Sequence, residues 1–264
     1  MSAIQSRSIA LPSGSVRYLV TGSGPALVYL HPMGGLRWTR VLERLAATHT
    51  VYAPTLPGFD GTPLHAGVAS GAALGGLTAA FIEAVVGPRA DVYGHSFGGW
   101  VAMWLAAEHP ARIDHLVLEA PGGLRPAEAP PPPADPAAFQ RALWLRPENH
   151  LADLREPGAD AGNPAMRTHY ALPASIDEAL APKLGTIAHQ TLLLGGTADI
   201  ITPSASQRYI KSRLPNCYLI YVYDAAHGIA GDQPDRTGRV VESFLTRSEA
   251  FLVNWGTSRL QDRG

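Results

Sequence analysis

The sequence predicts an α/β fold built on a mostly parallel sheet, with helices packed on both of its faces. Short apolar runs alternate with helix-like stretches along almost the whole chain, which is typical of β-α-β units. The runs are apolar at consecutive positions, as in Ala26–Leu30 and Thr191–Leu194, so the strands are expected to be covered on both sides. With 264 residues, the chain is long enough for one large domain or two small ones.

The expected elements follow one another in a regular order. A hairpin opens the chain, with strands at Arg7–Leu11 and Ser15–Leu19 on either side of a Pro-Ser-Gly turn, and it gives the sheet an antiparallel edge. Further strands are expected at residues 26–30, 50–53, 90–93, 115–119, 191–194 and 217–223. Helices are expected at about residues 36–47, 69–86, 97–108, 204–214 and 235–246.

The alternation is interrupted between about residues 121 and 183. This stretch holds 12 of the 23 prolines, including the run Pro130–Pro133, which cannot continue a helix or a central strand. Short helices are expected inside it at 137–145 and 175–180. Long insertions in regular folds are usually functional or disordered, and this one has apolar side chains to dock: Phe139, Trp144, Met166 and Tyr170. We interpret residues 121–183 as a lid, with residues 1–120 and 184–264 as the core domain.

The composition of the chain limits which kinds of binding partner it is expected to have. The net charge is −1 and only 16% of residues are charged. The charge of the whole chain therefore gives no electrostatic attraction to nucleic acid or to an anionic membrane. The single cysteine, Cys217, excludes an internal disulfide and a cysteine metal cluster, and we expect it buried in a strand. No apolar run reaches the roughly 18 residues of a membrane span. We therefore expect a cytoplasmic protein with a small-molecule substrate, and homodimerisation stays open.

The first chemical signal is the GxSxG motif at Gly94–Gly98, with Ser96 at its centre. The motif follows the strand expected at 90–93 and opens the helix expected at 97–108, as a nucleophile elbow requires. Such a turn is tight, and Gly94, Gly98 and Gly99 leave room for it. Ser96 would then lie at a helix N-terminus, where backbone N–H groups face developing negative charge.

A serine hydroxyl needs a base to take its proton, and His227 is the best-placed of the ten histidines. It follows the strand expected at 217–223, at the edge of a parallel sheet where ligands bind. His95 lies inside the elbow, and its side chain is expected to pack or to bind substrate. His31 ends a strand near the site and is a weaker rival as base.

The third member of a catalytic triad should be a carboxylate at another strand end. Asp199 follows the strand expected at 191–194, which gives the chain order Ser, Asp, His. Asp224 is a competitor, but it lies only three residues before His227 and is poorly placed to reach the far ring nitrogen. Glu119, at the end of the strand 115–119, is the alternative acid.

An oxyanion hole needs two backbone donors. One is expected to be the N–H of Phe97, directly after the nucleophile. The other should come from the loop His31–Gly35; because Pro32 has no N–H, the donor is Met33 or Gly34. We favour Met33, whose side chain would border the acyl pocket.

Together these motifs resemble the α/β-hydrolase fold family of single-domain bacterial serine hydrolases. The likeness covers about residues 7–246 apart from the lid, and it implies an eight-stranded sheet, a lid inserted after the sixth strand, and catalysis without metal or other cofactor. Pro32 replaces the glycine of the His-Gly pair that is common in the first loop of this family. Because proline has no N–H, this departure affects which residue can supply the second oxyanion donor.

Several reactions use such a site, because function depends on the site and not on the fold. We expect hydrolysis of a small carboxylic ester or lactone through an acyl-enzyme. Carbon–carbon bond hydrolysis of a diketone and cofactor-free peroxidase activity are alternatives on the same fold, and a non-catalytic receptor is a weaker one. For substrate contacts we expect His31, His95 and Trp144. Three lid arginines could receive a carboxylate or simply face solvent: Arg141, Arg146 and Arg167.

Overall fold

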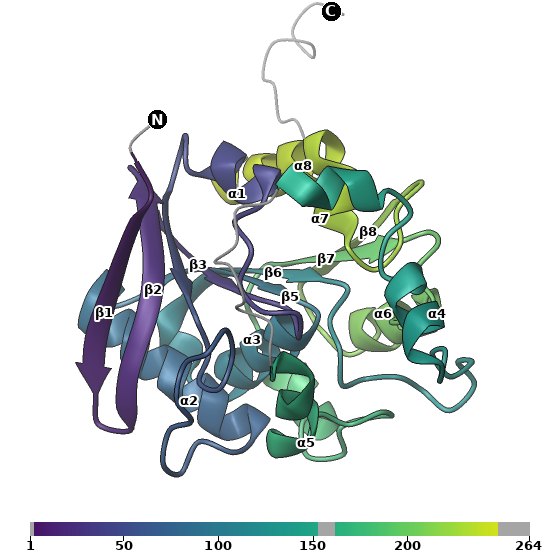
Figure 1. The fold of residues 1–264 in the computed structure, drawn as a ribbon, viewed down its shortest axis with the longest axis horizontal. Coiled ribbons are helices and arrows are strands. Elements are labelled where there is room, and N and C mark those ends of the chain that lie inside the picture. The colour runs from purple at the N-terminus through teal and green to yellow at the C-terminus, as the bar shows by residue number, and fades with distance from the viewer. Residues whose placement is uncertain (1–2, 153–161, 248–264) are drawn as a thin grey trace, which may run out of the picture.

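An eight-stranded sheet runs through the middle of the molecule (Figure 1). The computed structural model describes residues 3–152 and 162–247 of the chain. The strands lie in the order β1-β2-β4-β3-β5-β6-β7-β8. Their bounds are β1 Gln5–Leu11, β2 Gly14–Gly22, β3 Ala26–Leu30, β4 Thr50–Pro54, β5 Ala90–His95, β6 Ile113–Glu119, β7 Thr191–Gly196 and β8 Cys217–Val222.

Only the first part of the sheet is antiparallel. β1 pairs with β2 and β2 pairs with β4 in antiparallel fashion, whereas every later neighbour pair is parallel. The carboxyl ends of β3, β5, β6, β7 and β8 therefore meet along one edge, where parallel sheets place their ligands. The predicted fold class, with its antiparallel opening hairpin, is confirmed.

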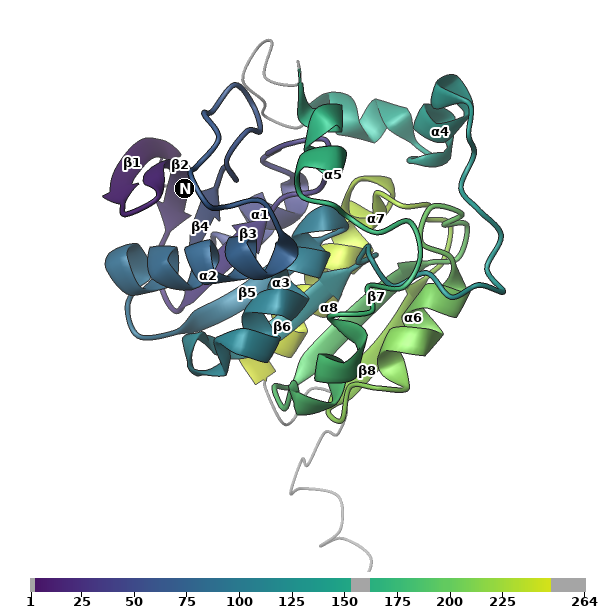
Figure 2. The same cartoon turned by 90° about the horizontal axis from the view of Figure 1, so that it is seen from below.

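Helices cover both faces of the sheet, as the two perpendicular views show (Figures 1 and 2). Helices α2, α3 and α6 pack on one face, and α1, α7 and α8 on the other. Their bounds are α1 Arg40–Leu45, α2 Gly71–Phe81, α3 Phe97–Glu108, α6 Ser204–Lys211, α7 Ile229–Asp232 and α8 Pro234–Arg247.

The continuous apolar strands supply both layers of the core. In β3, Val28 and Leu30 belong to the cluster under α2 and α3, while Leu27 and Tyr29 belong to the cluster under α1 and α8, because successive side chains of a strand point to opposite faces. Cys217 is likewise buried, in β8, and burial raises the pKa of its thiol to about 12.

Two expected helices differ from those observed. The first is short and begins only at Arg40, because Thr39 caps it by accepting the backbone N–H of Leu42. The second stops as an α-helix at Phe81 and continues as a π-helical turn, Ile82–Val86. A 3-10 turn, Pro110–Arg112, joins α3 to β6.

Residues 121–183 are called the lid segment here, and their described parts, 121–152 and 162–183, contain only short elements. These are α4 (Pro136–Ala142), α5 (Met166–His169) and 3-10 turns at Pro147–Ala152, Asn163–Ala165 and Ala181–Thr186. The helix expected at 175–180 is wrong: Ile176 forms an isolated antiparallel bridge with Leu124, and the Asp177 side chain accepts the backbone N–H groups of Ala179 and Leu180 in a turn. The sequence also predicts that the C-terminal tail, residues 248–264 with Phe251, Leu252 and Trp255, packs back as a last short helix; these residues lie outside the described part of the chain.

Candidate active site

Ser96 occupies a strained turn between β5 and α3. Its φ is 53° and its ψ −109°, a region that residues with a Cβ avoid. Small neighbours make the turn sterically feasible, since a Cβ on Gly94 would lie 2.4 Å from the carbonyl oxygen of Gly98. The Ser96 N–H donates to the carbonyl of Glu119 at 2.9 Å. The turn thus holds the serine side chain at the carboxyl edge of the sheet.

His227 lies on the loop after β8 and is buried. Its Nε2 is 2.8 Å from Ser96 Oγ, and its Nδ1 is 3.1 Å from Asp199 Oδ2. A glycine in β7 permits the close approach of this loop, because a Cβ on Gly196 would lie 2.2 Å from the carbonyl oxygen of Ala226. The three residues singled out in the sequence therefore form one hydrogen-bonded chain.

Asp199 is held as a carboxylate by the residues that follow it. Its Oδ1 accepts the backbone N–H groups of Ile201 at 2.8 Å and Thr202 at 2.9 Å, and its Oδ2 accepts the Thr202 hydroxyl at 2.7 Å. Burial alone would raise the pKa of Asp199, but His227 and the hydrogen bonds from Thr202 outweigh burial and lower it. Sequence reasoning missed Thr202; its signal was an Asp-x-x-Thr spacing at the end of a strand.

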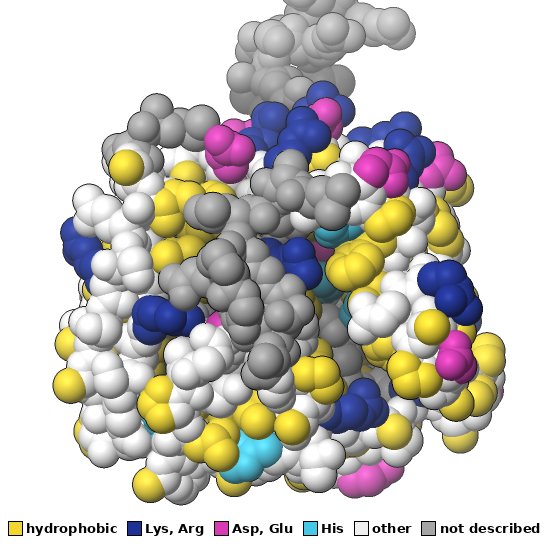
Figure 3. All heavy atoms as spheres, viewed as in Figure 1, with side chains coloured by type: hydrophobic (Ala, Val, Ile, Leu, Met, Phe, Trp, Pro, Cys, Tyr) yellow, Lys and Arg dark blue, Asp and Glu magenta, His cyan; other side chains and the backbone are white. Residues whose placement is uncertain are grey.

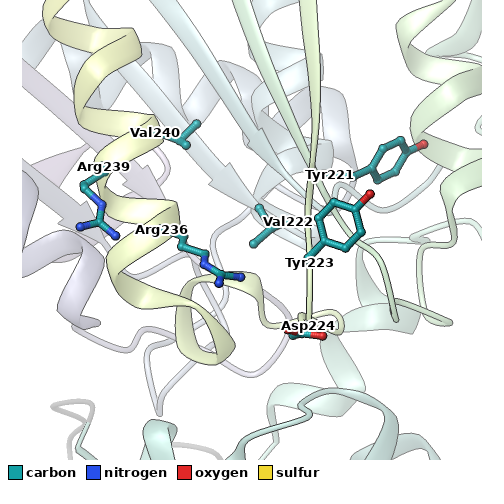
Figure 4. Close-up of a pocket in the computed structure, with 7 residues that line it drawn as sticks. All are labelled: Tyr221, Val222, Tyr223, Asp224, Arg236, Arg239 and Val240. Carbon is teal, nitrogen blue, oxygen red and sulfur yellow. The ribbon is translucent and has the colours of Figure 1, made fainter.

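The two rival acids have other surroundings. Glu119 is fully buried; it accepts the Tyr93 hydroxyl and, at 2.7 Å, the backbone N–H of Ala230. Asp224 is exposed and lies at the rim of a separate surface groove between β8 and α8, beside Tyr223 and Arg236 (Figure 4). The His227 ring therefore faces Asp199 and neither of these two carboxylates.

The loop after β3 lies directly against the start of α3. A Cβ on Gly98 would come within 2.0 Å of the carbonyl oxygen of Leu30 and 2.8 Å of that of His31. This close approach brings the backbone of residues 31–35 beside Ser96, and Met33 and Gly34 line the same cavity as Ser96. Phe97, the first residue of α3, is fully buried. Met33, expected to supply one oxyanion-hole donor, thus shares the cavity wall with Ser96, and Phe97, expected to supply the other, follows the serine directly.

The expectation that His31 contacts substrate needs correction. The ring is fully buried and is not part of the cavity wall. Its Nε2 accepts the backbone N–H of Leu56 at 3.0 Å, and its Nδ1 donates to the carbonyl of Pro32 at 2.8 Å. The imidazole thus joins the backbone of the loop after β3 to that of the segment after β4, and this position gives it a structural role.

The other two expected contact residues do line the cavity. His95 Nε2 lies 3.2 Å from the carbonyl oxygen of His227, and burial lowers the pKa of His95, which favours its neutral form. Trp144 packs so closely on the His227 loop that a Cβ on Gly228 would lie 2.3 Å from its indole ring.

The cavity above Ser96 has a volume of about 600 Å³, within the range of small-molecule sites. The lid segment supplies much of the cavity wall. The face of the molecule seen in Figure 3 has hydrophobic side chains around its middle, with histidine and basic side chains among them. Of the three lid arginines, Arg167 lines the cavity. Arg141 and Arg146 do not belong to the part of the cavity wall that the described residues form. Arg37 and Arg125 line it as well.

The described residues include neither a metal-binding cluster nor a membrane-spanning helix. No group of three or more His, Cys, Asp or Glu side chains in residues 3–152 and 162–247 is arranged to hold a metal ion. No helix in that part of the chain is long and apolar enough to cross a membrane.

A buried carboxylate, Asp232, joins the His227 loop to the lid segment. Its Oδ2 accepts the backbone N–H groups of Ala226 at 2.8 Å and Leu145 at 3.0 Å, and its Oδ1 accepts that of Arg146 at 2.8 Å. Burial alone would raise the pKa of Asp232, but His150 and these N–H groups outweigh burial and hold it below its ordinary value of 3.8.

We expect Asp232→Asn to lower the free energy of unfolding at pH 7 by about 1–3 kcal/mol. Since folding lowers this pKa, the stabilisation is complete above the unfolded-state value and is lost as the pH falls through the folded-state value. Urea unfolding of wild type and variant should therefore differ at pH 7, and the difference should shrink as the pH falls below about 4 and vanish only below the folded-state pKa. Asp224→Asn, at an exposed site, is the control. It should change neither the free energy of unfolding at pH 7 nor its dependence on pH. A pH-independent difference for Asp232→Asn would contradict this account.

Comparison with known proteins gives a consistent picture. The model of a family described as "Alpha/beta hydrolase family" matches residues 27–240. A pimeloyl-[acyl-carrier protein] methyl ester esterase of Neisseria meningitidis serogroup B is 32% identical over 250 residues, which cover 86% of this chain and 90% of that protein. A 2-hydroxymuconate semialdehyde hydrolase of a Pseudomonas species is 27% identical over 266 residues, covering 89% and 88%.

A solved structure is similar in fold. It is a serine hydrolase of the bacterium Cycloclasticus zankles, which degrades polyaromatic hydrocarbons; it superposes with a TM-score of 0.77 at 17% identity and covers 96% of this chain and 100% of that one.

Proposed function

This chain belongs to the alpha/beta hydrolase family, and from that premise we propose that it is a serine hydrolase acting on a small carboxylic ester or lactone. The observation that carries the proposal is the chain of contacts from Ser96 Oγ through the His227 ring to Asp199, at the floor of a cavity of about 600 Å³. A non-catalytic receptor would have no need of this alignment. The esterase relative, at 32% identity, points to the same bond type.

In the acylation step, Ser96 Oγ attacks the carbonyl carbon while His227 Nε2 takes the hydroxyl proton. The carbonyl π electrons move to oxygen, and the N–H groups of Phe97 and Met33 stabilise the resulting oxyanion. Asp199 accepts from Nδ1–H, which keeps Nε2 available as the base and stabilises the imidazolium. When the tetrahedral intermediate collapses, the C–O bond to the alcohol breaks and His227 returns the proton to the alcohol.

Deacylation repeats the same steps with water. His227 takes a proton from water as its oxygen attacks the acyl carbon, and the second tetrahedral intermediate expels Ser96 with the proton returned to Oγ. The products are a carboxylic acid and an alcohol, or one hydroxy acid if the substrate is a lactone. We propose that the lid segment closes the cavity and selects the acyl group.

A substrate panel tests the proposal. It holds p-nitrophenyl esters of increasing chain length, methyl esters, lactones and a vinylogous diketone acid, each assayed with wild type and with Ser96→Ala. We expect Ser96-dependent cleavage of esters or lactones. Cleavage of the diketone alone would contradict ester hydrolysis and favour carbon–carbon bond hydrolysis, the reaction class suggested by the Pseudomonas relative.

Trp144→Ala is expected to change acyl selectivity more than folding. The indole lines the cavity and lies against Gly228 in the His227 loop, so its removal lengthens the acyl pocket. The preferred p-nitrophenyl ester should become longer by several carbons, with kcat/KM changed about tenfold between short and long esters. An equal loss for all esters with a lower Tm would instead mean that Trp144 is purely structural.

A further inference from the structure

Two buried side chains, Asp60 and Asn163, bind each other beside the loop after β3, and Asn163 lines the same cavity as Ser96. Asn163 Nδ2 donates to Asp60 Oδ1 at 2.8 Å, and Asn163 Oδ1 accepts the backbone N–H of Asp60 at 2.8 Å. Asn163 is 1% exposed and Asp60 7%. Asp60 lies in the turn after β4 and Asn163 in the lid segment, so this pair joins two parts of the chain that are about a hundred residues apart.

Both members of the pair also hold the loop that follows β3. Asp60 Oδ2 accepts the backbone N–H of Leu36 at 2.7 Å, and Asn163 Nδ2 donates to the carbonyl of Gly34 at 3.1 Å. Between these two points, a Cβ on Gly35 would lie 2.1 Å from Asp60 Oδ1 and 2.5 Å from Asn163 Nδ2. The pair therefore packs directly on the loop backbone, and the peptides at residues 34–36 cannot move without breaking its hydrogen bonds.

Asp60 adopts a backbone conformation that is uncommon for residues with a Cβ, although Asp and Asn adopt it more readily than other such residues. Its φ is +49°, in the left-handed region, where a side chain with a Cβ is disfavoured. Such a conformation persists when surrounding contacts over-determine it. Here the contacts are those of the carboxylate with Leu36 and Asn163.

We propose that Asp60 and Asn163 are positioning residues that hold the Met33 donor of the oxyanion hole in place. The inference rests on the proposed ester hydrolysis. The start of the loop is anchored by its contact with Gly98 and the bond of His31 to Leu56, and its end by Asp60 and Asn163. A donor anchored on both sides needs no rearrangement when the oxyanion forms, which is the condition for strong stabilisation.

The pair also couples the lid segment to the reaction. Asn163 belongs to the lid segment and donates to the Gly34 carbonyl. Moving the lid segment away would therefore remove a hydrogen bond that holds the loop just after Met33. The consequence is a defect in the transition state rather than in binding, because an oxyanion is absent from the ground state.

The test compares an ester with the thionoester of the same acyl and leaving groups. Sulfur accepts hydrogen bonds weakly, so a well-placed donor favours the oxygen substrate more than a displaced one does. We expect Asn163→Ala to lower kcat for the ester about tenfold to a hundredfold, less than the ~10²–10³ of a lost donor, with KM changed by less than about threefold. The ratio of kcat/KM for ester over thionoester should fall about tenfold. Asp60→Asn, which keeps the side-chain volume, should shift the ratio in the same direction.

Asp177→Asn is the matched control. Asp177 is a buried lid-segment carboxylate too, but its Oδ2 accepts the indole N–H groups of Trp100 and Trp104 in α3. This variant should lower Tm and keep the wild-type ester-to-thionoester ratio. Circular dichroism establishes that each variant is folded at the assay temperature.

Two results separate the possible failures. An active wild type whose ratio is unchanged in folded Asn163→Ala and Asp60→Asn would overturn the positioning role alone. A wild type that cleaves neither substrate and is not labelled at Ser96 by a fluorophosphonate would overturn the proposed function and this inference with it. A lowered ratio in both variants, with the Asp177→Asn ratio unchanged, would support the positioning role.

Discussion

Replacing Ser96 with alanine is expected to lower kcat for the preferred ester about 10⁵–10⁶-fold, as loss of the triad nucleophile does in a serine hydrolase. The reason is that Ser96 Oγ, 2.8 Å from His227 Nε2, is the atom proposed to form the acyl bond. Alanine keeps the Cβ and the backbone hydrogen bonds of the turn, so Tm should change by only a few degrees. Steady-state assays and thermal unfolding of the same preparation measure both quantities.

Ser212→Ala serves as the control for this variant, because Ser212 is exposed at the end of α6. It should keep the wild-type kcat. A Ser96→Ala variant that retains more than about a hundredth of wild-type kcat would contradict the nucleophile assignment.

Asp199→Asn is expected to lower kcat by up to ~10⁴ with little effect on folding. An amide can still accept the N–H of Ile201 or Thr202, but beside His227 Nδ1 it favours the wrong tautomer, in which the nitrogen facing Ser96 carries the proton. The defect should therefore appear in kcat at every pH where the wild type is active. Steady-state kinetics between pH 6 and pH 9 measure it.

The rival carboxylates provide the comparison. Asp224→Asn should stay within roughly tenfold of wild-type kcat, about 1.4 kcal/mol, because the residue is exposed and lies beside the groove at α8. Glu119→Gln should lower Tm, since Glu119 accepts from Tyr93 and Ala230. A tolerated Asp199→Asn together with a severely impaired Asp224→Asn would mean that the acid is misassigned.

Much of the fold and part of the site could be predicted because the determining signals are local. Apolar runs of strand length specify which segments are buried on both faces, and parallel pairing then brings the ends of β5, β7 and β8 to one edge. Ser96, Asp199 and His227 each follow one of those ends, so their meeting follows from topology alone.

The remaining features depend on contacts between distant segments. His31 follows β3 as a site residue would, yet its ring turns inward to bind the backbone of Leu56, which no local pattern indicates. The same holds for Asp60 with Asn163 and for Asp232 with the lid segment. The predicted helix at 175–180 failed because propensity cannot foresee the pairing of Ile176 with Leu124.

The central claim, that Ser96 forms a covalent acyl bond during ester cleavage, is tested most directly by active-site labelling. Wild type is treated with a fluorophosphonate in slight excess, and residual esterase activity is followed alongside intact and peptide mass spectrometry. The account predicts one adduct per chain, on the peptide that contains Ser96, formed in proportion to the loss of activity and absent from Ser96→Ala. Full activity in a chain labelled at Ser96, or inactivation with the adduct on another residue, would contradict it.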